Sequence, residues 1–212
     1  MTYVENIFVL LAAPLVACLF VVADKGRLTV ASLLSGMFAC LLSSYLSAFF
    51  AAWMGMGSRL TAIEVAPVVE EVVKLLPLLY YLLVIDPDAT DAGQVVTFVA
   101  VGFATMESAF YLAEFGPDSP VTLALRGLSA SMMHLTCGVV VGLGMRHVWE
   151  HPWLKVAGSA GLLSMAIVFH GLYNLLVAAG GIAQSVALAI PLLALVVVVS
   201  IRRWKAWPSQ NA

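Results

Sequence analysis

Charged residues are scarce in this chain, and their scarcity decides its class. The 212 residues include 10 Lys and Arg and 12 Asp and Glu, whereas 62% of the sequence is hydrophobic and the mean hydropathy is +1.02. A soluble domain of this length cannot bury so much apolar surface. The sequence therefore predicts an integral membrane protein that is surrounded by the lipid bilayer.

Two further absences exclude other classes of protein. The net charge is -2 and the chain has no basic run or stacking platform, so a nucleic-acid partner is not expected. Cys18, Cys40 and Cys137 lie in apolar segments without CxxC or metal-type spacing, and no HExxH motif is present. Neither a disulfide framework nor a redox pair is indicated.

Long apolar runs are what the chain has instead, each near the roughly 20 residues that a helix needs to cross the hydrocarbon. The seven expected spans are 6–23, 28–53, 62–85, 93–114, 121–147, 155–179 and 183–204. The loops between them are too short to form a soluble domain, and no repeat is detectable. The predicted fold class is all-α: a polytopic membrane bundle of about seven transmembrane helices, forming a single domain over residues 1–212.

The basic residues of the loops predict the orientation of this bundle. One side carries Lys25, Arg27, Arg146, Lys155, Arg202, Arg203 and Lys205. The other side carries Arg59 and Arg126. Because cytoplasmic loops hold the excess of Lys and Arg, we expect the N-terminus outside and the C-terminus in the cytoplasm.

Six ionisable residues nevertheless fall inside the apolar runs. They are Glu70, Glu71, Lys74, Glu107, His134 and His170. A charge near the bilayer centre costs at least about 2.5 kcal/mol, so such residues usually face the bundle interior and mark a site. Along their helices, Glu70, Glu107 and His170 lie roughly 10 to 14 Å below the outer ends. His134 reaches the same depth if its helix enters the hydrocarbon near Arg126, and we therefore expect one polar layer supplied by four helices.

Spacing along the helices adds detail to this layer. Residues four apart share a helix face, which places Glu70 with Lys74 and His170 with Asn174. Glu70 and Glu71 are adjacent and point about 100° apart. One of the two carboxylates can therefore face a cavity while the other pairs with Lys74 or with a neighbouring helix.

Four motifs carry these residues. They are EEVVK at 70–74, GFATME at 102–107 with Tyr111, His134 with Gly138, and HGLYN at 170–174. In these motifs the chain resembles the PrsW-type intramembrane proteases, a branch of the superfamily that contains the CAAX prenyl proteases and bacteriocin-processing membrane proteins. The resemblance spans about residues 64–176. Phe103 stands four residues before Glu107, where CAAX relatives have FxxxH, and this difference favours the PrsW branch.

The resemblance implies an intramembrane endopeptidase that cleaves a membrane-anchored protein or peptide. Members of the family include proteases that make the first cut in a membrane-bound anti-sigma factor. Glu70 would be the general base that activates water, with Glu71 as its orienter or stand-in. His170 and Asn174 would donate hydrogen bonds to the oxyanion. The resemblance also implies a multi-pass protein of the plasma membrane of a prokaryotic cell.

The remaining motif residues receive roles from the same resemblance. Glu107 and His134 would position the water or shuttle a proton to the leaving amine. Lys74, Phe103 and Tyr111 would support the catalytic groups. In this reading the enzyme is a glutamate-type protease, and no cofactor is expected.

A metal-dependent version of the same protease is the alternative. Two His and two or three Glu from facing helices provide ligands suited to zinc or another divalent ion. Glu107, His134 and His170 would then ligate the metal, while Glu70 or Glu71 acts on the bound water. From the sequence alone, the metal-free mechanism is preferred to the metal-dependent one.

Other classes of function remain open at this stage. Buried Glu and His also serve proton relays, so a proton-coupled transporter or channel is a rival, as is a catalytically silent binding or immunity protein on the same scaffold. Some residues have plain structural readings. Gly138 and Gly142 are expected to allow close helix packing, and His147 and His151 to form a solvated pair at the inner interface.

Overall fold

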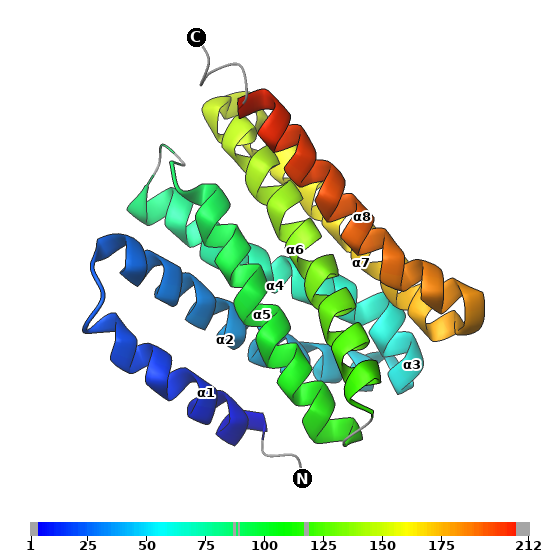
Figure 1. Ribbon diagram of the computed structural model, residues 1–212. Coiled ribbons are helices and arrows are strands. Elements are labelled where there is room, and N and C mark those ends of the chain that lie inside the picture. Colours follow the sequence, from blue (N-terminus) through cyan, green and yellow to red (C-terminus); the bar gives the residue numbers. More distant parts are fainter. Residues whose placement is uncertain (1–3, 87, 89, 117–118, 207–212) are drawn as a thin grey trace.

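The computed structural model of the chain is all-helical (Figure 1) and describes residues 4–86, 88, 90–116 and 119–206. The elements are α1 (Val4–Leu19), α2 (Asp24–Met54), α3 (Ser58–Leu60), η1 (Thr61–Val65), α4 (Ala66–Tyr80), η2 (Tyr81–Ile85), α5 (Ala92–Phe115), α6 (Pro120–Glu150), η3 (Pro152–Leu154), α7 (Lys155–Ala179) and α8 (Gly181–Ala206). No strand occurs within the described residues. The predicted all-α class is confirmed.

Each expected span coincides with a helical stretch, and the expected span 62–85 is the continuous run of η1, α4 and η2. In the described chain, 4 stretches are long and apolar enough to cross a membrane: α2, α5 (to Glu114), α6 and Pro152–Ala179. α1 and α8 contribute shorter apolar helices. The chain is therefore a multi-pass membrane protein, while seven spans and the orientation of the termini stay predictions.

α5 is the central helix of the bundle, packed between α2 on one side and α6 on the other, with α1 outside α2 (Figure 1). Two glycines permit the close approach of α2 and α5. A Cβ atom on Gly36 would lie 2.0 Å from the carbonyl oxygen of Val99, and one on Gly102 would lie 2.0 Å from that of Leu33. No side chain fits at either position, so the two backbones touch there.

α5 and α6 approach each other in a similar way. A Cβ atom on Gly142 would lie 2.3 Å from Cγ1 of Val96, and one on Gly138 would lie 3.0 Å from Cβ of Ala100. The predicted role of Gly138 and Gly142 in close helix packing is confirmed. This packing holds α6, which carries His134, against α5, which carries Glu107.

The apolar core has two parts. One part gathers side chains of α2, η1, α4 and α5 around Met37 and Met106, and the other gathers side chains from α4 to α8 around Leu78 and Met145. Polar residues of α4, α6 and α7 lie buried where these helices meet, among them His134 and Glu71, which is salt-bridged to His170. Glu107 of α5 contacts His134 and is only partly buried. The fold thus encloses a polar centre within an apolar bundle.

Candidate active site

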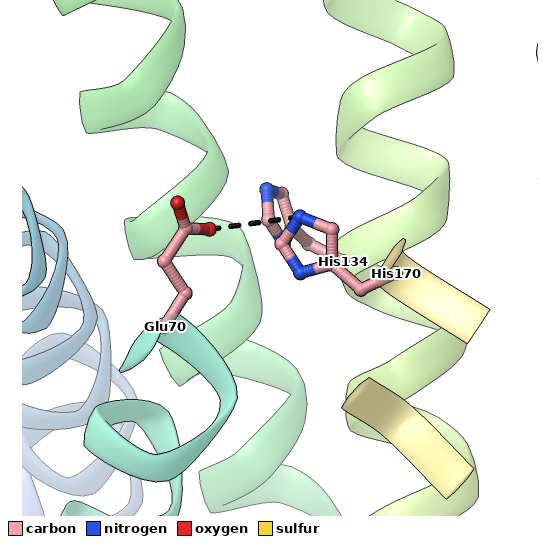
Figure 2. Close-up of side chains that lie close together, drawn as sticks. All are labelled: Glu70, His134 and His170. Atoms are coloured by element: carbon pink, nitrogen blue, oxygen red, sulfur yellow. Dashed lines mark ion pairs between the residues drawn. The ribbon is translucent and has the colours of Figure 1, made fainter. Parts of the chain in front are cut away.

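Three side chains from three helices converge at the centre of the bundle. Glu70 extends from α4, His134 from α6 and His170 from α7, and one potential ligand atom of each lies within 4.8 Å of the others. His134 and His170 are buried, and the carboxylate of Glu70 points towards their imidazole rings (Figure 2). Two nitrogens and one oxygen therefore share a small space inside the protein.

Glu71 fixes the orientation of His170. Its Oε1 atom lies 2.8 Å from Nδ1 of His170 and 2.5 Å from Nζ of Lys74, and both Glu71 and Lys74 are buried. Because the carboxylate accepts the Nδ1 proton, Nε2 of His170 is the unprotonated nitrogen, and it faces Glu70 at 3.7 Å. Lys74 supplies the charge that balances the buried Glu71.

Glu70 differs from its neighbour because one of its oxygens is unsatisfied. Oε2 of Glu70 is buried and has no hydrogen-bond partner in the described part of the chain, a state that it shares with Oγ of Ser47 alone. Leaving a buried acceptor without a partner costs about 1–3 kcal/mol, and more for a charged group. Such an atom indicates a place where a cation or a proton donor belongs.

His134 connects this centre to α5. Its Nδ1 lies 2.9 Å from Nζ of Lys74 and its Nε2 lies 2.7 Å from Oε2 of Glu107. Because an ammonium group only donates, Nδ1 accepts from Lys74, and Nε2–H donates to Glu107. The ring of Phe103 packs against that of His134, with 4.9 Å between centroids, and Nζ of Lys74 lies 4.7 Å from the centroid of Phe103.

The structure thus brings together most of the residues that the motifs singled out. They are Glu70, Glu71, Lys74, Phe103, Glu107, His134 and His170. The polar layer expected from helix depths is present as a connected network. The catalytic roles assigned to its members stay predictions.

Asn174 has a different position from the one expected. Its Nδ2 donates to the carbonyl oxygen of Ala62 at 2.8 Å. In η1 the backbone N–H of Ala66 donates to Thr61, five residues back. The corresponding donor to Ala62 would be residue 67, which is a proline and has no N–H. Asn174 supplies this missing donor, and therefore ties α7 to the entrance of α4.

Tyr111 also lies away from the converging side chains. The guanidinium carbon of Arg126 lies 3.5 Å from the centroid of the Tyr111 ring. Both residues line a cavity of about 170 Å³ between α5 and α6, together with Glu107, Ser108, Leu112, Leu123, Gly127 and Ala130. The cavity reaches the candidate site through Glu107.

Sequence reasoning missed two contributors to the site region. It used Arg126 only to place the point where its helix enters the hydrocarbon, whereas Arg126 contacts Tyr111, which stands one turn from Glu107 on the same face of α5. It also gave no role to Tyr173, whose hydroxyl lies 2.8 Å from that of Ser129 and links α7 to α6. The motif HGLYN contains Tyr173, but spacing alone does not reveal a partner on another helix.

A second group of potential ligands lies at the far end of α6. One atom each of His147, Glu150 and His151 lies within 4.8 Å of the others. These side chains are exposed or half-buried, and Nδ1 of His151 contacts the carbonyl oxygen of His147 at 2.9 Å. The solvated histidine pair expected from the sequence accounts for this group.

The residues present fit a divalent metal. Oε2 of Glu70 and Nε2 of His170 are turned towards each other without hydrogen bonds, and Glu71 stands behind His170 as the outer carboxylate that commonly orients a ligating histidine. His134 is the third donor within reach. The sequence named Glu107, His134 and His170 as possible ligands, whereas the group that converges in the structure contains Glu70 in place of Glu107. Which residues bind the metal stays a prediction.

Comparison with known proteins gives one match. The profile described as PrsW family intramembrane metalloprotease covers residues 25–201 of the chain. No curated protein and no solved structure matches. The family is one of metalloproteases, so the expectation that the enzyme needs no cofactor is wrong, and the alternative with a divalent metal is favoured. The match covers most of the sequence, and this chain belongs to the PrsW family of intramembrane metalloproteases.

Proposed function

We propose that this protein is a metal-dependent endopeptidase that hydrolyses a peptide bond of a membrane-anchored protein or peptide in the plasma membrane of a prokaryotic cell. The observation that carries the proposal is the convergence of Glu70, His134 and His170 on one buried point, with an unsatisfied carboxylate oxygen among them. Family membership supports proteolysis over transport or passive binding.

Glu70, His134 and His170 would hold the metal. A divalent ion bound there supplies a Lewis acid that polarises the scissile carbonyl and makes water a stronger nucleophile. Glu70 and His170 offer their atoms without rearrangement. Nε2 of His134 donates its proton to Glu107, so it would have to lose that proton to bind the metal, and metal binding would release it to solvent.

Glu71 and Lys74 hold the ligands in place. Glu71 keeps Nδ1 of His170 protonated and thereby keeps Nε2 available. Lys74 contacts both Glu71 of α4 and His134 of α6. One ammonium group therefore links two of the helices that carry the proposed ligands. Neither residue needs to touch the substrate.

Glu107 is the group best suited to move protons during the reaction. It contacts His134 on one side and lines the cavity between α5 and α6 on the other. A carboxylate in this position can accept a proton from the attacking water and give it to the leaving amine. In the metal-dependent alternative expected from the sequence, Glu70 or Glu71 acts on the bound water. Here Glu107 takes that role.

Cleavage of co-reconstituted membrane-anchored peptides tests the proposal, with a membrane-bound anti-sigma factor as the first natural substrate to try. We expect wild-type protein to cleave, a divalent-metal chelator to stop cleavage, and zinc or another divalent ion to restore it. Elemental analysis should find about one metal ion per chain. The His170→Ala variant should lose both metal and activity.

His147→Ala is the matched control, because His147 belongs to the exposed group at the other end of α6. It should keep both metal and activity. Cleavage that persists after complete removal of metal would contradict the proposal. Metal loss in His147→Ala together with retention in His170→Ala would move the site to the end of α6.

A further inference from the structure

The cavity between α5 and α6 begins at the candidate active site and is also lined by a cationic side chain. Glu107, which contacts His134, and Arg126 both line it. We propose that this cavity binds the substrate segment next to the scissile bond, and that Arg126 selects substrates by binding a carboxylate on that segment. The inference rests on the proposed function, because it names the class of substrate for the same site.

Arg126 is positioned to bind an anion. It is exposed, its guanidinium lies 3.5 Å from the centroid of the Tyr111 ring, and no carboxylate of the described residues forms an ion pair with it. Stacking on an aromatic ring uses the face of the guanidinium and leaves its N–H edge available. That edge matches a carboxylate in a bidentate arrangement.

The cavity has room for a peptide chain. Gly127 and Ala130 line its α6 side, and a Cβ atom built on Gly127 would meet no atom within 4 Å. Ser108 and Glu107 add polar atoms on the α5 side. Small residues on one wall and polar atoms on the other suit an extended backbone, which needs both space and hydrogen-bond partners.

Charge favours an acidic group near Arg126 over one near Glu107. Glu107 is the nearer of the two to the metal-ligand candidates, and its carboxylate is occupied by His134. Glu114, on the last turn of α5, does not line the cavity. A substrate carboxylate would therefore find a cationic partner at Arg126, whereas the Glu107 end of the cavity is lined by a carboxylate.

The spacing predicts where the acidic residue lies in the substrate. Arg126 precedes His134 by eight residues on α6, which is about 12 Å along the helix axis. An extended chain advances about 3.3 Å per residue, so it covers this distance in about three to five residues. We expect the selected Asp or Glu at that separation from the scissile bond.

Fluorescent single-span peptides test the inference. They carry Asp, Asn or Lys at one scanned position of the juxtamembrane segment. Binding is measured on the full-length Glu70→Gln variant, which is expected not to cleave, and cleavage on the protein with native Glu70. At the responsive position the Asp peptide should bind about tenfold more tightly than the Asn peptide, as expected for a charged hydrogen bond.

Variants of the cavity sharpen the test. Arg126→Glu should reverse the preference from the Asp to the Lys peptide, and Arg126→Gln should remove it. Tyr111→Phe keeps the ring and should keep the preference. Gly127→Leu should weaken binding of every peptide, because its side chain would occupy part of the cavity, while its Cβ atom meets no atom within 4 Å. Thermal unfolding of each variant shows that it is folded.

The outcomes separate this inference from the proposed function. Equal binding of the three peptides at every position, or a preference that survives in Arg126→Glu, overturns the inference even if cleavage occurs. A charge preference that reverses with Arg126→Glu supports it. If that preference is present but no peptide and no protein substrate is cleaved with metal bound, the cavity binds acidic segments and the proposed hydrolysis fails.

Discussion

Two adjacent glutamates of α4 have opposite surroundings although they share one motif. Glu71 has two hydrogen-bond partners, Lys74 and His170, whereas Oε2 of Glu70 has no hydrogen-bond partner among the described residues and lies 3.7 Å from Nε2 of His170. The sequence predicts that the two carboxylates diverge, because neighbouring residues on a helix point about 100° apart. It could not tell which one faces His170 and Lys74, since the rotation of α4 about its axis depends on the helices packed around it.

The same pair gives a prediction at the level of single residues. Glu71→Gln leaves the buried Lys74 without its counter-charge, which costs about 3–5 kcal/mol, so thermal unfolding of the metal-free protein should begin at a lower temperature. Glu70→Gln removes an unsatisfied oxygen and should change metal-free stability little. It should instead abolish the stabilisation that added metal gives, which is about 2.7 kcal/mol at a hundredfold excess over the dissociation constant.

A double variant serves as the control for this comparison. Glu71→Gln combined with Lys74→Met removes both charges and should recover much of the stability that Glu71→Gln loses. If Glu70→Gln is the more damaging of the two single changes in metal-free protein, the assignment of the unsatisfied oxygen is wrong. Differential scanning fluorimetry with and without zinc distinguishes these results.

At the scale of elements, Asn174 joins two helices through a defect in one of them. The proline at position 67 deprives the carbonyl of Ala62 of its π-helical donor, and the amide of Asn174 replaces it. The sequence placed Asn174 on the face of His170, which is correct for spacing. The resemblance to the PrsW proteases implied an oxyanion role for it, which stays a prediction. The contact with Ala62 could not be predicted, because a π turn and the carbonyl that it leaves without a backbone donor are not visible in the sequence.

Removing the Asn174 amide should therefore affect stability more than chemistry. Asn174→Ala removes an exposed hydrogen bond to a backbone acceptor and should cost about 0.5–1.5 kcal/mol. Pro67→Ala restores an N–H at the position where it is missing, so the cost of Asn174→Ala should be smaller in that background. A double-mutant cycle of unfolding free energies measures the coupling. Normal stability with a large fall in kcat would instead support the oxyanion role.

The contact between α2 and α5 gives a second prediction for elements. Gly102→Ala would place a Cβ atom 2.0 Å from the carbonyl oxygen of Leu33, so the helices must separate. We expect a loss of about 1–3 kcal/mol or more in unfolding free energy, because overpacking strains both helices. Gly93→Ala, on the same helix, meets no atom within 4 Å and should be neutral or stabilising. Similar stabilities for the two variants would contradict the close backbone contact.

For the whole molecule, hydropathy was enough to predict the helices. Each expected span overlaps a helical stretch, since the length of an apolar run is a strong local signal. The arrangement of the helices was not predictable in the same way. The contacts of Gly36 with α5 and of Gly102 with α2 join two helices that do not follow each other in the sequence. The cavity at Arg126 lies between consecutive helices, but it depends on how closely their side chains pack.

The orientation of the bundle is the last prediction. α2 and α6 end at opposite ends of the bundle (Figure 1). Gly57 follows α2 and Glu150 is the last residue of α6, and both are exposed. With the basic loops in the cytoplasm, Gly57→Cys should react with a membrane-impermeant maleimide in intact cells, and Glu150→Cys only after the membrane is opened. Cys18→Ala, Cys40→Ala and Cys137→Ala provide the unlabelled background.

The result also decides from which side a substrate reaches Arg126. The cavity lies near the end of α5 and the start of α6, and α2, which precedes Gly57, ends at the same end of the bundle (Figure 1). Labelling of Gly57→Cys in intact cells would place the acidic segment of the substrate on the extracytoplasmic side. The reverse pattern would invert the bundle and require the same segment to approach from the cytoplasm.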